Sequence, residues 1–378
     1  MQMSTLFQLA VTGLLAASLP LAMVWMSTDA NKYRKLVWVT VFLTFDLIVF
    51  GGFTRLTDSG LGCPDWPGCY GAANPFLALA DIKAAEALMP TGPVTVVKAW
   101  IEMIHRYLAR GIGVLIMALM ATAWLQWKKT RRAAFAPAIP TALFLFVLVQ
   151  GAFGAWTVTL KLQPVIVTIH LLLGMGLLAL LTWLGERQNR LLSVPALSAG
   201  QGGAAPSAAL KTLRLLGLAS AIVLTLQIAL GGWVSTNYAT LACTEFPLCG
   251  GKLVPEMDFE HGFHLWRELG KTAAGHYLPF QALVAIHWVH RNFAFVLIAV
   301  LGLTVWRAWA HAPLRPVARA IAVVLAAQAA TGLATVFLDF PLAIAVLHNA
   351  GAALLVLTVT MLNYKIKYPT TVLQASHH

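Results

Sequence analysis

Charged residues are scarce in this sequence of 378 residues. Only 11% are Asp, Glu, Lys or Arg, whereas 59% are hydrophobic. A soluble globular domain carries about 25% charged residues, so this composition excludes that class. Apolar runs near the ~20 residues needed to cross a bilayer recur along the whole chain. The sequence therefore predicts an all-α polytopic membrane protein.

Acidic residues are the scarcer kind, 14 against 26 basic ones, and a net charge of +12 could suggest a nucleic-acid-binding protein. The distribution of the basic residues excludes nucleic acid as a partner, because sixteen of them fall in alternate loops between nine expected spans. The positive-inside rule makes that side cytoplasmic, with the N-terminus outside and the C-terminus inside. The expected spans are 4–26, 36–54, 99–126, 135–157, 164–185, 213–234, 281–306, 318–338 and 341–363.

The N-terminus lacks two marks of a signal peptide. No positively charged region precedes the first apolar run, and no cleavage site with small residues follows it. We therefore expect 4–26 to remain as a membrane helix.

Cysteine is also rare, and its four copies lie in two long outer loops, "CPDWPGC" and "CTEFPLC". Two C-x5-C pairs on the oxidising side of a membrane predict two local disulfides, Cys63–Cys69 and Cys243–Cys249. The alternative is four free thiols. A zinc site is disfavoured because C-x5-C is not the usual spacing of zinc ligands.

The chain contains an internal repeat. "FDLIVFGGFTRLT" and "LQIALGGWVSTNY" precede the two cysteine loops, and "IEMIHR" and "VAIHWVHR" follow them. A glutamine helix and then a second histidine helix complete each copy. The sequence thus predicts two pseudo-repeated four-helix bundles plus one extra N-terminal helix. The expected parts are the extra helix (1–35), the first half (36–192), a flexible cytoplasmic linker (193–210), the second half (211–364) and a tail (365–378).

Four histidines lie one to two turns inside the outer ends of their predicted helices. In each half the two histidine helices run in the same direction, so the imidazoles meet across one bundle at one depth. Facing histidines predict two bis-histidyl haem sites, and an adjacent arginine could pair with haem propionates. The alternative is that each histidine forms a hydrogen bond to a neighbouring helix. The residues are His105, His170 and Arg106 in the first half, and His290, His348 and Arg291 in the second.

The two halves differ three residues before the first histidine, where the first half has Glu102 and the second has His287. A carboxylate near iron can accept protons or stabilise a developing cation. The alternative is an ion pair between Glu102 and Arg106, which are four residues apart on a helix. Three further histidines in the second outer loop, His261, His264 and His276, could bind a metal, but loop histidines are usually solvated.

The run "GGFTRLTDSGLGCPDWPGCYG", the E-x-x-H-R from Glu102 to Arg106 and the repeated later histidines resemble the haem A synthase family. The resemblance extends from about Lys35 to Lys365. It implies oxidation of the C8 methyl of haem O to the formyl group of haem A, by two hydroxylations and loss of water. It also implies a bacterial-type inner membrane location and a role in building terminal oxidases.

The same resemblance implies roles for individual residues. His290 and His348 would hold a haem b cofactor, and His105 and His170 would flank the iron of the substrate, haem O. Glu102 matches the essential acid of the family, and both cysteine pairs match its outer disulfides. His287 departs from the family pattern and leaves the haem b ligand open between His287 and His290, although the His-Arg pairing favours His290.

The implied partners are haem O, membrane lipid, haem O synthase, the terminal oxidase assembly machinery and an electron acceptor of unidentified kind. The competing hypothesis is a di-haem b electron-transfer protein that oxidises quinol without modifying haem. A carboxylate beside only one of the two sites favours the enzyme. A transporter is disfavoured because no span carries a broken-helix pattern.

Overall fold

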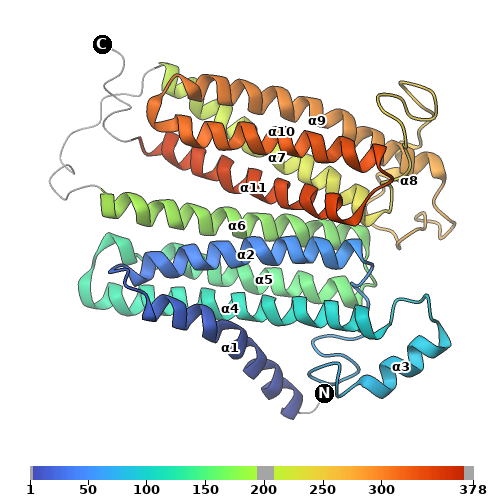
Figure 1. Cartoon of the computed structure of the whole chain (residues 1–378), viewed down its shortest axis with the longest axis horizontal. Coiled ribbons are helices and arrows are strands. Elements are labelled where there is room, and N and C mark those ends of the chain that lie inside the picture. The colour runs from blue at the N-terminus through green and yellow to red at the C-terminus, as the bar shows by residue number, and fades with distance from the viewer. Residues whose placement is uncertain (1–2, 194–207, 370–378) are drawn as a thin grey trace. The chain divides into compact units, whose positions relative to one another are not determined.

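The computed structural model describes residues 3–193 and 208–369. Within these ranges its regular structure is helical, with only isolated β-bridges in the loops (Figure 1). Residues 194–207 of the predicted linker and 370–378 of the predicted tail lie outside the described residues. The long helices are α1 (Met3–Met26), α2 (Lys32–Leu56), α4 (Val96–Thr130), α5 (Ala138–Thr159), α6 (Pro164–Ser193), α7 (Ala208–Thr236), α9 (Phe280–Trp309), α10 (Arg315–Phe337) and α11 (Leu342–Lys367).

The predicted membrane class is confirmed. In the described part of the chain, nine helices are long and apolar enough to cross a membrane, and they match the nine predicted spans with ends shifted by several residues. The sequence did not predict the short helices of the loops. These are α3 (Leu79–Leu88), α8 (Phe259–Gly262) and the 3-10 turns η1 (Ala133–Phe135) and η3 (Ala312–Leu314).

Local sequence signals set the ends of the helices. The side chain of Thr95 accepts a hydrogen bond from the backbone N–H of Lys98 at 3.2 Å and so caps α4, and Asn31 caps α2 in the same way. Pro164 begins α6, a position where its missing N–H costs nothing. Pro341 immediately precedes α11. Because these two prolines mark the starts of α6 and α11, His170 and His348 lie within the first two turns of their helices.

The chain divides into two compact units. The first unit consists of the chain up to Leu177 and the segment His264–Tyr277. The second unit consists of Leu178–Phe263 and the chain from Leu278 onward. The boundary therefore falls inside α6, and part of the second outer loop groups with the first unit. The predicted boundaries of the sequence repeat, 36–192 and 211–364, stay a prediction.

The first unit contains a closed ring of four helices, called bundle 1 below. Helix α4 contacts both α2 and α5. Helix α6 completes the ring, because its residue Gly174 faces Gln150 of α5 and Ile48 of α2. Helix α1 lies outside this ring against α4, where Gly13 and Gly111 allow close approach of the two backbones (Figure 1).

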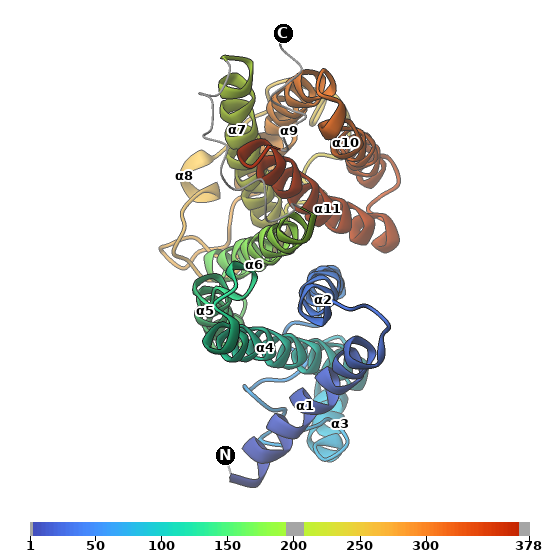
Figure 2. The ribbon, with the colours of Figure 1, turned by 90° about the vertical axis from the view of Figure 1, so that its left-hand side faces the viewer.

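The second unit contains an equivalent ring, called bundle 2. Helix α9 contacts α7 and α10, and α11 contacts α10 and α7, as the view in Figure 2 shows. In each bundle the histidine-bearing helices are the second and fourth of the ring. They therefore lie diagonally across the bundle, with their inner faces toward each other.

Candidate functional site

Each of the four predicted histidines packs against a glycine of a neighbouring helix. A methyl group added to the glycine would lie 2.9–3.1 Å from Cε1 of the imidazole, closer than a real Cβ normally approaches. A larger residue would force the imidazole to shift, so glycine at these positions allows the close packing of each ring. The pairs are Gly51 with His105, Gly154 with His170, Gly231 with His290 and Gly332 with His348.

The two histidines of each bundle lie on diagonal helices of its ring, and each imidazole packs against a glycine of a neighbouring helix. The pairs are His105 with His170 in bundle 1 and His290 with His348 in bundle 2. The Nδ1 atoms of His105 and His170 are buried and have no hydrogen-bond partner. A buried polar nitrogen without a partner is costly, so these rings fit a bound group that the protein atoms alone do not supply. Two imidazoles in one bundle are donors that would bind a haem iron.

Glutamine side chains contact three of the four histidines. Gln150 Nε2 donates to the carbonyl oxygen of His170 at 3.1 Å. Gln227 Nε2 lies 3.1 Å from both Nδ1 and the carbonyl oxygen of His290. Gln328 Nε2 lies 3.3 Å from Nε2 of His348. In place of a glutamine, His105 has the ring of Phe50 stacked beside it, with centroids 6.2 Å apart.

The sequence interpretation overlooked Gln227. Gln150, Gln227 and Gln328 each precede a histidine-facing glycine by four residues, which places amide and glycine on one helix face. That shared spacing was a detectable signal.

Glu102 is buried, with 4% of its surface exposed, and both of its oxygens are engaged. Oε1 accepts from Arg106 Nη2 at 2.5 Å, and Oε2 accepts from the backbone N–H of Cys63 at 2.7 Å. The ion pair proposed as the alternative role of Glu102 is therefore present. Glu102 thus links α4 to the first cysteine loop through hydrogen bonds. Its catalytic role stays a prediction.

Arg106 also binds the cysteine loop directly. Its Nη1 donates to the carbonyl oxygens of Asp65 at 2.9 Å and Gly68 at 2.5 Å. In bundle 2, Arg291 does the same, donating to the carbonyl oxygens of Glu245, Pro247 and Leu248. Each arginine next to a candidate ligand thus anchors the loop of its own bundle. The predicted pairing of these arginines with haem propionates stays a prediction.

Both predicted disulfides are present. Cys63–Cys69 and Cys243–Cys249 each have Cα atoms 4.9 Å apart and are fully buried within their loops. In both loops the second cysteine forms a small β-bridge to the residue three positions later. The first loop is further closed by Asp65, whose carboxylate accepts from the N–H groups of Tyr70 and Gly71.

His287 occupies the place in bundle 2 that Glu102 occupies in bundle 1. Its side chain is buried, with 6% exposed, and its ring hydrogen-bonds to the backbone of Ala239, while its Nδ1 has no partner. His290, one turn away, is the histidine that faces a glycine of α7. This geometry favours His290 over His287 as the residue aimed into bundle 2.

The histidines of the second outer loop do not gather. Among the described residues, no group of three or more His, Cys, Asp or Glu side chains is placed to hold a metal ion. His261 Nδ1 lies 2.7 Å from Asp258 Oδ2. The backbone N–H of His261 also donates to this carboxyl and is the main cause that lowers its pKa.

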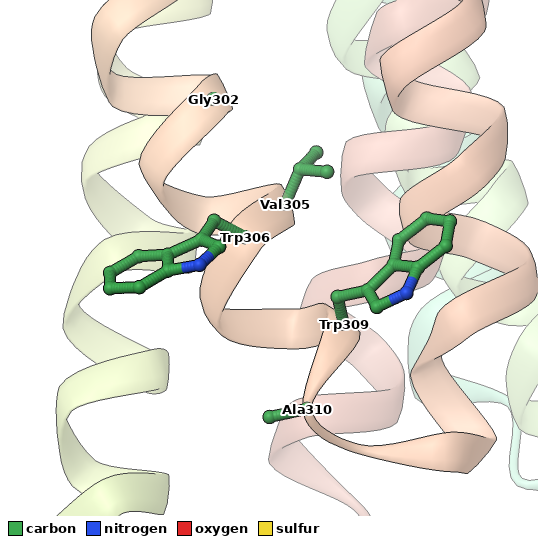
Figure 3. Close-up of a pocket in the computed structure, with 5 residues that line it drawn as sticks. All are labelled: Gly302, Val305, Trp306, Trp309 and Ala310. Atoms are coloured by element: carbon green, nitrogen blue, oxygen red, sulfur yellow. The ribbon is translucent and has the colours of Figure 1, made fainter.

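An open apolar groove lies at the far end of α9 from His290. Figure 3 shows Trp306 and Trp309 projecting from the helix beside Gly302 and Val305. Gly302 is ~18 Å along the helix axis from His290, at 1.5 Å per residue. The groove is therefore separate from the histidine pair.

The fold and these contacts define a class: a polytopic helical membrane protein in which two bundles each bring two histidine rings together beside a disulfide-closed loop. The chain belongs to the cytochrome oxidase assembly protein family, whose profile matches residues 34–360. Helix α1 precedes the matched range.

Curated relatives cover most of this chain. A protein of Shewanella oneidensis named "Heme A synthase" is 37% identical over 335 residues, which are 87% of this chain and 96% of the relative. A protein of Methylobacterium radiotolerans with the same name is 30% identical over 361 residues, 89% of this chain and 90% of the relative.

Proposed function

We propose that this protein is a haem A synthase, a membrane oxidoreductase that converts a methyl group of haem O into the formyl group of haem A. The observation that carries the proposal is the family membership of the chain together with relatives of that name across nearly its whole length. The paired histidines support it independently, because an enzyme that modifies haem needs a haem-sized site with iron ligands.

Bundle 1 is the proposed substrate site. His105 and His170 would hold the iron of haem O from its two sides. The carboxylate of Glu102 lies one turn from His105 on the same helix and is already fixed by Arg106 and by the N–H of Cys63. A fixed negative charge there would stabilise positive charge that develops on the methyl carbon during oxidation.

Bundle 2 is the proposed cofactor site, with His290 and His348 as ligands of a haem b. When bound, this haem supplies one-electron redox chemistry. The residues fit such a group, since both imidazoles belong to one bundle and glycines on α7 and α10 leave room for the rings. Bundle 2 carries His287 where bundle 1 carries Glu102, so only bundle 1 has an acid beside its histidine pair.

The proposed orientation places the disulfide loops and both histidine pairs toward the outer face of a bacterial-type inner membrane, with the C-terminus in the cytoplasm. The basic loops support it through the positive-inside rule. Haem O synthase would then supply the substrate, terminal oxidase assembly would take the product, and an external acceptor would receive the electrons.

The test is deletion of the gene followed by pigment analysis of the membranes. We expect haem A to disappear and haem O to accumulate, and a plasmid copy to restore haem A. Purified protein should then contain haem b together with haem O or haem A, identified by pyridine haemochrome spectra. Haem b alone in both sites, with haem A unchanged in the deletion strain, would instead indicate the di-haem electron-transfer protein.

A further inference from the structure

The open groove on α9 continues onto α10. Gly302 and Val305 line it beside the two tryptophans in Figure 3, and the same two residues line its continuation. A methyl group added to Gly302 would meet nothing within 4 Å, so the groove is open there. The other wall of the continuation comes from α10, through Ala322, Leu325, Ala326 and Ala329.

The length of the groove matches one leaflet of a membrane. From Ile298 to Ala310 it extends ~18 Å along the axis of α9, at 1.5 Å per residue. Half of a hydrocarbon core ~30 Å thick is ~15 Å. Trp306 and Trp309 lie at one end, as tryptophans do at a membrane–water interface. The groove therefore has room for an acyl chain that lies along the protein.

The tryptophan end of the groove carries only positive charge. Neither α9 nor α10 contains an acidic residue. Arg307 lies over the ring of Trp306, with Cζ 4.8 Å from the centroid. In the described part of the chain, Arg307, Arg315 and Arg319 form no ion pair with a carboxylate. This end is thus suited to an anionic group.

Two of these arginines belong to the groove itself. Arg315 Nε donates to the carbonyl oxygen of Trp309 at 2.9 Å, which holds the guanidinium at the end of the groove. Arg319 lies one turn further along α10 and three residues before Ala322, so both residues lie on one helix face. Both arginines are exposed. The small residues of α10 therefore continue into a pair of cations.

Bundle 1 has different side chains at the corresponding positions. The glycines that face His170 and His348 set the correspondence between α5 and α10. Counted from them, Arg319, Ala322 and Ala326 correspond to Thr141, Phe144 and Leu148. Thr141 accepts from Nε1 of Trp124 at 3.0 Å. The alanines and the exposed cation are therefore particular to bundle 2.

We propose that this groove binds one anionic phospholipid, with an acyl chain between α9 and α10 and the phosphate of the headgroup beside Arg315 and Arg319. Basic pockets between membrane helices bind anionic headgroups in this way. A quinone would fit the apolar part, but its uncharged head would gain little from two guanidinium groups. The groove is separate from both histidine pairs, so the inference does not depend on the proposed function.

The experiment locates the lipid by photo-labelling. The protein is reconstituted into phosphatidylcholine vesicles that contain a small fraction of phosphatidylglycerol with a diazirine on an acyl chain. After illumination, mass spectrometry of the peptides should find the label concentrated in 298–329. Arg315→Gln and Arg319→Gln should each lower this label about 5-fold, and the double variant about 30-fold, since each basic residue near an anionic headgroup favours binding by about that factor.

The matched control removes two charges from the corresponding turn of bundle 1. Lys128→Gln with Lys129→Gln should leave the label in 298–329 unchanged. Ala322→Phe with Ala326→Leu installs the bundle 1 side chains and should abolish the label although both arginines remain. If that variant does not assemble, Gly302→Leu fills the groove from α9. All variants are compared at equal haem content, so that unfolded protein does not contribute.

Four results would overturn the inference. Phosphatidylcholine with the same diazirine could label 298–329 as strongly as phosphatidylglycerol does, which would exclude recognition of the headgroup. The lysine control could lose as much label as the arginine variants do, which would indicate attraction to the whole membrane surface. The label could persist in the variants that fill the groove, which would exclude the groove as the site. Displacement of the label by excess ubiquinone, with no effect of the arginine variants, would identify a quinone as the occupant.

Discussion

Replacing Glu102 by glutamine separates its structural role from a role in chemistry. The substitution keeps the shape and an acceptor for the N–H of Cys63 but removes the negative charge 2.5 Å from Arg106. The two side chains are only 5% and 8% exposed, so the guanidinium would keep its charge in a buried place without its carboxylate. Breaking a buried ion pair costs about 3–5 kcal/mol. Arg106 retains the carbonyl oxygens of Asp65 and Gly68, so we expect a loss near ~3 kcal/mol, the lower end of that range.

The two roles predict different amounts of product. If Glu102 only supports the loop, Glu102→Gln lowers the thermal unfolding temperature, but haem A per folded molecule stays normal. If Glu102 also stabilises charge on the substrate, haem A per folded molecule should fall by about 100–1,000-fold, the usual effect of removing one preorganised electrostatic group. The assay is the ratio of haem A to haem b in protein purified from the same membranes, together with a thermal melt.

Arg106→Gln and the double variant complete the cycle. For a catalytic Glu102, Arg106→Gln should mainly lower stability and reduce product less than Glu102→Gln does. A wild-type ratio of haem A to haem b in Glu102→Gln would refute the catalytic assignment. So would equal losses of product in both single variants with no further loss in the double variant, because the pair would then act as one structural unit.

Three other predictions follow from the contacts. Mass spectrometry of unreduced, alkylated protein should find no label on Cys63, because it is bonded and buried, and full labelling without reductant would contradict this. His290→Ala should remove most of the haem b and His287→Ala should remove much less, since only His290 faces a glycine of α7. The opposite order would show that His287 is the ligand. Gly231→Ala places a methyl group 2.9 Å from the His290 ring and should lower the haem b content several-fold. Gly302→Ala is the control, because its methyl group enters open space. Equal haem b contents in the two variants would show that Gly231 is not needed.

The predictions made from sequence succeeded where the signal is local. Hydropathy over one helix length is a property of consecutive residues, and all nine predicted spans are helices. Cys63 and Cys69 lie close in the chain, so their pairing needed no knowledge of the fold. The repeated order of motifs predicted that the helices of His105 and His170 belong to one bundle, and in bundle 1 each of these imidazoles packs against a glycine of a neighbouring helix.

The tertiary structure decided what each polar side chain contacts, because those contacts join residues far apart in the chain. Arg106 binds a carbonyl 41 residues earlier, at Asp65, and Glu102 binds the N–H of Cys63, 39 residues earlier. Helical periodicity identifies the face on which a side chain lies but not the loop that folds over that face.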